Sequence, residues 1–148
     1  MNFVSPSRGL FIFTPLFLIS LVGMYRAWRS GFGGPLARYL IAVVVLHTLL
    51  IAVIWPGHCY GPRYFADMTH LFMFFLLPVI SWWLARPAIG SRLTVAGLLV
   101  LAGWGVFVHV HGATSIAANQ WSALPVNVDD ARGRVWDWHD PQFLRGLR

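Results

Sequence analysis

The chain has 148 residues, of which 57% are hydrophobic and only 11% are charged. Soluble domains carry about 25% charged and roughly 45–50% apolar residues, so this composition argues against a soluble enzyme and favours an integral membrane protein. All eleven basic residues are arginines, scattered singly or in loose pairs, so the net charge of +6 does not predict a nucleic-acid partner. The single cysteine, Cys59, excludes an intramolecular disulfide.

Four apolar runs without charged residues follow one another along the chain. They are residues 10–25, 39–55, 68–84 and 93–110, with 16 to 18 residues each. Because roughly 17–25 helical residues cross a bilayer, we predict an all-α integral membrane protein with about four transmembrane helices and the lipid bilayer as its surroundings. Pro15 interrupts the first run, for which a cleaved signal peptide is the alternative.

Arginines in the short connecting segments predict the orientation. The segments after the first and third runs hold five arginines, whereas the N-terminal segment and the one between the second and third runs hold two. By the positive-inside rule the first set faces the cytoplasm, so both termini of this multi-pass protein are expected outside the cell membrane. The chain thus divides into a transmembrane region, residues 1–111, and an extracytoplasmic tail, residues 112–148, in which Asp140 and Pro141 begin a short terminal helix.

The segment at residues 55–67 combines glycine, proline, aromatic and polar residues at one membrane edge. In a helix that starts at Pro62, the residues Arg63, Asp67 and His70 lie at i, i+4 and i+7 and share one face. A planar guanidinium group suits an anionic phosphate, so Arg63, oriented by Asp67, is a candidate contact for a phosphate or a lipid pyrophosphate. An interfacial ion pair that only anchors the helix is the alternative.

The histidines suggest a second class of function. Five of the six are expected at or near the outer side, where they would suit a metal site, although His109 and His111 lack the i, i+4 spacing of two ligands on one helical face. A haem would need two histidines facing each other, and His47, in the middle of its run, has no obvious partner. We expect His47 to form a hydrogen bond to a neighbouring helix.

Three stretches resemble the C-terminal portion of bacterial GT-C glycosyltransferases, the class that includes protein-mannosyltransferase-like enzymes. They are SPSRGLFIFTP at residues 5–15, WPGHCYGPRY at residues 55–64 and VWDWHDPQFLR at residues 135–145. The resemblance extends over nearly the whole of this chain, but over only the last third or so of a family member. The Gly-Pro-Arg-Tyr sequence with its upstream tryptophan is the most specific of the three.

The resemblance implies sugar transfer from a lipid-phosphate donor, such as a polyprenyl-phosphate sugar, on the outer face of the membrane. The candidate residues for binding the lipid phosphate or substrate are Arg63, Tyr64, Asp67, His70, His58 and Arg8. His58 stands where the family usually has a second glycine. The family's catalytic acids lie in an early outer loop that has no counterpart here, so no catalytic residue and no cofactor is assigned to this chain. A divalent metal is implied only for a complete enzyme.

The expected function is therefore the C-terminal transmembrane part of a GT-C-like glycosyltransferase, as a fragment or as one half that needs an N-terminal catalytic membrane portion. Two other classes remain open. A non-enzymatic membrane subunit or scaffold would lack the acidic loop altogether, and an outer-face metal or haem protein would carry stoichiometric metal or a Soret band.

Overall fold

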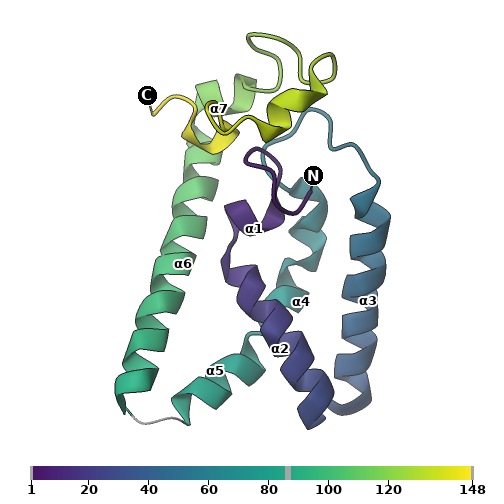
Figure 1. Cartoon of the computed structure of the whole chain (residues 1–148), viewed down its shortest axis with the longest axis vertical. Coiled ribbons are helices and arrows are strands. Elements are labelled where there is room, and N and C mark those ends of the chain that lie inside the picture. The colour runs from purple at the N-terminus through teal and green to yellow at the C-terminus, as the bar shows by residue number, and fades with distance from the viewer. Residues whose placement is uncertain (1, 86–87, 148) are drawn as a thin grey trace.

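The computed structural model of the protein describes residues 2–85 and 88–147, and every regular element within them is a helix. The all-α prediction is confirmed for this part of the chain. In Figure 1, α2 (Leu16–Ser30) crosses the middle of the molecule, with α3 (Gly34–Ala52) on one side and α6 (Ala88–Thr114) on the other. Because α2 also contacts the shorter helices that follow α3, it is the central element of the bundle.

Three helical segments are long and apolar enough to cross a membrane. They are Gly34–Ala52, Arg63–Leu84 and Arg92–Thr114, and each contains most of one predicted run. Leucines on their surfaces point away from the protein, for example Leu49 at 63% and Leu99 at 67% exposure. Such an outward apolar surface is what a lipid environment favours.

The first predicted run is not one helix. It forms α1 (Leu10–Phe13) and then α2, and Thr14 between them has φ −136° and ψ 73°. A residue before proline is forced out of the helical region, and Pro15 has no backbone N–H to continue the helix. Because α2 has only 15 residues, helices of spanning length account for three of the four predicted spans.

The third run is interrupted once, at residues 75–76. It follows a 3-10 helix, η1 (Arg63–Met68), starts as α4 (Thr69–Phe74) and resumes as α5 (Leu77–Leu84). Pro78 lies in the first turn of α5, where its missing N–H leaves the carbonyl of Phe74 without a helical partner. At this break the backbone of Gly23 approaches the carbonyl of Phe75 so closely that a Cβ atom at Gly23 would lie 1.6 Å from that oxygen. The glycine therefore lets α2 pack directly on the interrupted helix.

A polar cap covers one end of the helices. We define it as the N-terminal segment 2–9, the loop 55–62 and the tail 115–147. The tail contains α7 (Ile116–Gln120) and the 3-10 turns η2 (Arg132–Trp136) and η3 (Gln142–Leu144). The first and last segments of the chain lie at this same end (Figure 1).

The predicted terminal helix is only the three-residue turn η3. Pro141 is extended, with ψ 138°, so the turn starts one residue later than predicted. The chain is extended again at Arg145, and Gly146 has the left-handed φ of +88°, so no longer helix follows.

Candidate functional site

A lateral cleft of about 440 Å³ lies between α1 and α2 on one side, the η1–α4 segment on another, and α6 on the third. Most of its lining is apolar. The part farther from the polar cap is formed by Leu16, Phe17, Met73, Leu101, Ala102 and Val106. A cleft of this size and composition matches the usual description of a site for a small apolar or amphipathic molecule.

Apart from Thr69 at the start of α4, the polar lining of the lateral cleft lies at the end near the polar cap. Thr14 precedes α2, Arg63 begins η1, and His109 lies in the last two turns of α6, all close to the cap end of their segments. Oγ1 of Thr14 and Nε2 of His109 are 3.2 Å apart and share a hydrogen bond across the cleft. Tyr60 closes this end and donates from its hydroxyl to the carbonyl of Val108 at 2.7 Å. The cleft is therefore amphipathic along its length.

Arg63 supplies the cationic group of the lateral cleft. Its side chain is exposed, lies 5.1 Å from the centroid of the Tyr64 ring and donates from Nη2 to the Tyr64 hydroxyl at 3.4 Å. Among the described residues no carboxylate lies within ion-pair distance of Arg63. Its positive charge is thus available to an anion at the mouth of the cleft.

The shared helical face predicted for Arg63 and Asp67 is not formed. A 3-10 helix has three residues per turn, so residues at i and i+4 are a third of a turn apart instead of adjacent. Asp67 and His70 are exposed, and neither lines the lateral cleft. The structure therefore gives Asp67 no contact through which it would orient Arg63.

Tyr64 joins the cleft region to α3. Its carbonyl accepts a hydrogen bond from Nε2 of His47 at 2.8 Å, which confirms the predicted contact of His47 with a neighbouring helix. The Tyr64 ring packs on the core between α2, α3 and α4, where Phe17 stacks on Phe72 with 4.7 Å between the ring centroids. Tyr64 therefore fixes the start of η1, and its ring is the surface on which the Arg63 guanidinium rests.

His58 lies in the polar cap, away from the lateral cleft. Its Nε2 atom is 2.8 Å from Oδ1 of Asn127 and 3.4 Å from Oδ2 of Asp129. The indole N–H of Trp55 donates to Asp129 as well, at 2.6 Å, and Arg132 lies over the Trp55 ring. These contacts tie the loop 55–62 to the tail.

Arg8 is the most buried charged residue that was predicted for the site, with 0% exposure. It lies in the polar cap and does not line the lateral cleft. Nη1 donates to the carbonyl of Ser7 at 2.8 Å and to Oε1 of Gln142, and Nη2 donates to Oγ of Ser122 at 2.8 Å and to the carbonyl of Gly57 at 3.3 Å. One guanidinium group thus holds segments from both ends of the chain and from the loop 55–62.

All these partners of Arg8 are neutral. Within the described residues no carboxylate pairs with its guanidinium, and Nε has no acceptor. The group also lies 5.3 Å from the ring centroid of Trp121, over which Arg134 lies at 4.4 Å. Burial lowers the pKa of Arg8, because removing the guanidinium from water disfavours its charged form. An arginine still remains protonated in proteins, so neutral hydrogen-bond acceptors and the Trp121 ring stabilise its positive charge here.

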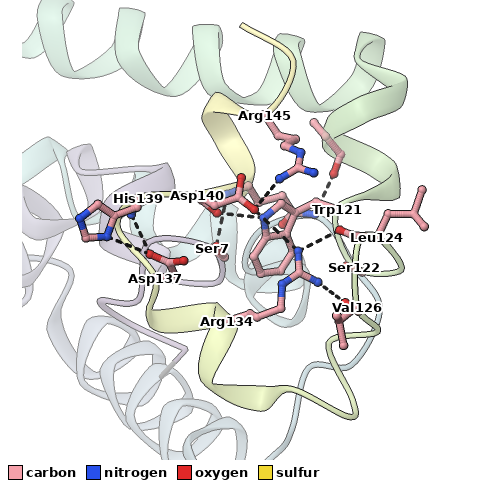
Figure 2. A network of polar contacts seen from close by, with 12 residues as sticks. Ser7, Trp121, Ser122, Leu124, Val126, Arg134, Asp137, His139, Asp140 and Arg145 are labelled. Carbon is pink, nitrogen blue, oxygen red and sulfur yellow. Dashed lines mark hydrogen bonds and ion pairs between the residues drawn. The ribbon is translucent and has the colours of Figure 1, made fainter. Parts of the chain in front are cut away.

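A second network in the polar cap lies beside Arg8 and is drawn in Figure 2. Arg134 donates to the carbonyls of Leu124, at 2.9 Å, and Val126, while Asp140 pairs with Arg145 at 2.5 Å and with Arg134 at 3.7 Å. These contacts join different segments of the tail to one another. None of its members lines the lateral cleft.

Two titratable side chains of the loop 55–62, Cys59 and Tyr60, favour their neutral forms. Burial raises the pKa of the Cys59 thiol, and it raises the pKa of Tyr60 to about 12. Within residues 2–85 and 88–147, no three His, Cys, Asp or Glu side chains are grouped as a metal site would require. The outer metal site that the histidines suggested as an alternative therefore has no group of ligands among the described residues.

The structure thus separates the six predicted residues. Of the six, only Arg63 lines the lateral cleft, and Tyr64 packs beside it on the core. Asp67 and His70 lie on the exterior, and His58 and Arg8 lie in the polar cap. Sequence reasoning missed the cleft's neutral polar residues and missed the partners of Arg8. For Thr14 and His109 a signal existed, because each is a polar group near the end of an apolar run. Gln142 gives no such signal, since its contact with Arg8 spans 134 positions.

Comparisons of the chain with models of protein families, with curated proteins and with solved structures find no match.

Proposed function

We propose that the protein is a multi-pass membrane protein whose lateral cleft binds a lipid that carries a phosphate headgroup. The observation that carries the proposal is the amphipathic lining of the cleft. Apolar side chains line the part farther from the polar cap, and the exposed Arg63 at the cap end has no carboxylate partner among the described residues. An acyl or isoprenoid chain would occupy the apolar part between α2, α4 and α6. The phosphate would then lie at the cap end, within reach of the guanidinium.

The membrane arrangement that we propose has four passes. Residues 10–30, formed by α1 and α2, would together extend about 30 Å at 1.5 Å per residue, close to the thickness of the hydrocarbon core. The arginine distribution favours a polar cap outside the cell membrane. A reporter fused at Ser122 should then give an extracytoplasmic signal and one at Gly33 a cytoplasmic signal, and the opposite pair of signals would invert this orientation.

The resemblance to GT-C glycosyltransferases extends the proposal to a lipid-phosphate-linked sugar. The resemblance implies acidic catalytic residues, and the lining of the lateral cleft contains no Asp or Glu among the described residues. In the enzymatic form of the proposal, this chain therefore binds the donor and another membrane portion supplies the acid. In the non-enzymatic form, the same cleft belongs to a subunit or scaffold that holds a lipid.

Lipid binding tests the proposal directly. The purified protein in detergent is titrated with a polyprenyl phosphate, with phosphatidic acid and with a neutral polyprenol, and bound lipid is measured by native mass spectrometry. We expect both phosphate lipids to bind more tightly than the neutral one, by about tenfold for one charge-assisted contact. Tighter binding of the polyprenyl phosphate would indicate an isoprenoid lipid, and tighter binding of phosphatidic acid would indicate a glycerolipid.

Arg63 variants identify the contact. Arg63→Ala should lose most of the preference for phosphate, and Arg63→Lys should lose part of it, because an ammonium group keeps the charge without the paired donors. Arg29→Ala is the matched control, since Arg29 is an exposed arginine at the far end of α2. Asp67→Asn should leave affinity unchanged. Equal binding of the phosphate lipids and the neutral polyprenol, or an unchanged preference in both Arg63 variants, would refute the proposal.

A further inference from the structure

Gln142 connects the buried Arg8 to the mouth of the lateral cleft. Its side-chain oxygen accepts from Nη1 of Arg8 and from the backbone N–H of Gly61, the latter at 3.4 Å. Its side-chain nitrogen donates to the carbonyls of Cys59 and Ala118, each at 3.0 Å. Gln142 has 0% exposure, and its amide uses both donors and both acceptor positions. Such a fully satisfied buried side chain fixes the segments that it touches.

The segment that Gln142 and Arg8 hold runs directly into the cleft. Arg8 binds the carbonyl of Gly57, and the hydroxyl of Ser122, itself bound by Arg8, donates to the carbonyl of Cys59 at 3.3 Å. Arg63 follows Gly61 by two residues. The backbone from Gly57 to Gly61 is thus held at three residues immediately before the cation of the cleft.

On its side facing α1 and α6, the loop 55–62 is packed too closely to move freely. Gly61 has a φ of +59°, and a Cβ atom there would lie 2.7 Å from the ring of Phe13. The ring of Tyr60 lies against Gly112, where a Cβ atom would be 2.0 Å from that ring. The loop is therefore closely packed on α1 and α6. The hydrogen bonds from Gln142 fix its position relative to these two helices.

We propose that Gln142, held in place by Arg8, is a positioning residue for the lateral cleft: it sets the backbone from Cys59 to Gly61 and thereby the place at which Arg63 meets a phosphate. The inference rests on the proposed function. Binding groups have to be held to about 0.5 Å by the residues behind them, and Gln142 supplies that support from the tail, 81 positions beyond Gly61. The tail thus acts on lipid affinity without touching the lipid.

A double-mutant cycle tests this coupling. Affinity for a polyprenyl phosphate is measured for the full chain with Gln142→Ala, Arg63→Ala and both substitutions. Gln142→Ala alone should weaken binding about fivefold, and it should have no further effect when Arg63 is already alanine, because residues that act through one another are not additive. An equal loss in both backgrounds would mean that Gln142 supports the whole fold, and no loss in either would mean that it does not position Arg63; both results would overturn the inference.

Two further variants separate positioning from attachment of the tail. Gln142→Glu keeps an acceptor for Arg8 and for Gly61 but loses the donations to Cys59 and Ala118, so the tail should stay attached, as read by hydrogen exchange, while affinity falls about threefold. Arg134→Gln should loosen the tail near Leu124 and Val126 and leave affinity unchanged. If lipid affinity falls only in the variant whose tail loses hydrogen-exchange protection, the inference is overturned.

The two proposals fail in distinguishable ways. If the unsubstituted protein shows no preference for a phosphate lipid, or if Arg63→Ala retains it, the proposed function fails. If Arg63→Ala loses the preference and Gln142→Ala does not alter affinity, the lipid site stands and only the positioning by Gln142 fails.

Discussion

The polar cap and the helices beneath it differ in which side chains they bury and which they expose. In the cap, polar side chains such as Ser7, Arg8 and Gln142 are buried and hydrogen-bonded, whereas the surfaces of α3 and α6 present leucines such as Leu49 and Leu99 outward. Directed hydrogen bonds specify the cap, because an unpaired buried polar group is costly. The exposed leucines of the helices suit an apolar environment, and the helices approach one another closely where they touch. The same kind of substitution should therefore have different effects in the two regions.

The largest expected effect is the loss of Arg8 from the polar cap. Arg8→Ala leaves four acceptors without their donor and opens a cavity, which together should destabilise the cap by about 4 kcal/mol. Hydrogen exchange should show loss of protection in the tail, for example at the bond from the N–H of Val128 to the carbonyl of Ser122, while α3 stays protected.

The control for Arg8 is Arg132→Ala. Arg132 is exposed over the Trp55 ring, so its removal should change stability by less than about 1 kcal/mol. Equal loss of protection in the tail and in α3 after Arg8→Ala would contradict the division of the molecule into two separately specified regions.

The next largest expected effect is on membrane insertion, when an aspartate replaces an exposed leucine in each of the two regions. Leu99→Asp on α6 should oppose membrane insertion by about 3 kcal/mol if this surface faces lipid. Leu124→Asp, at a residue 53% exposed in the polar cap, should be nearly neutral. Quantitative insertion of the two variants into microsomal membranes measures the difference. Equal insertion would show that α6 does not face lipid at Leu99.

Close helix approach gives the smallest of the three effects. Gly23→Ala would place a Cβ atom 1.6 Å from the carbonyl oxygen of Phe75, and the backbone shift that relieves it should cost about 2 kcal/mol. Thermal unfolding in detergent should report the loss. Gly97→Ala in α6, where nothing lies within 4 Å of the new atom, is the control and should be neutral or slightly stabilising. A similar loss in both variants would indicate a general effect of helix glycines.

The sequence predicted most of the helical region because its signals are local. The uncharged apolar runs located α3 and the greater part of α6, and Pro15 marked the break between α1 and α2. The conformation of η1 was missed, since apolar periodicity does not distinguish a 3-10 helix from an α-helix over six residues. That difference removed Asp67 from the side of Arg63.

The polar cap could not be predicted in the same way. Arg8 was assigned to a substrate site from a resemblance, and its position before the first apolar run suggests an ordinary flanking arginine. Its burial depends on Ser122 and Gln142, at separations of 114 and 134 residues. No local pattern encodes such contacts, so they become visible only once the fold brings the segments together.

The separation between Arg8 and Gln142 also sets an order of events during biosynthesis. When Arg8 is added to the growing chain, 134 residues that end at its partner have yet to be translated. Contacts of such high sequence separation form late, whereas in the proposed membrane arrangement each apolar helix enters the bilayer as soon as it emerges. The helices should thus be inserted while the first segment is still unattached, and the guanidinium stays hydrated until the tail arrives and closes over it.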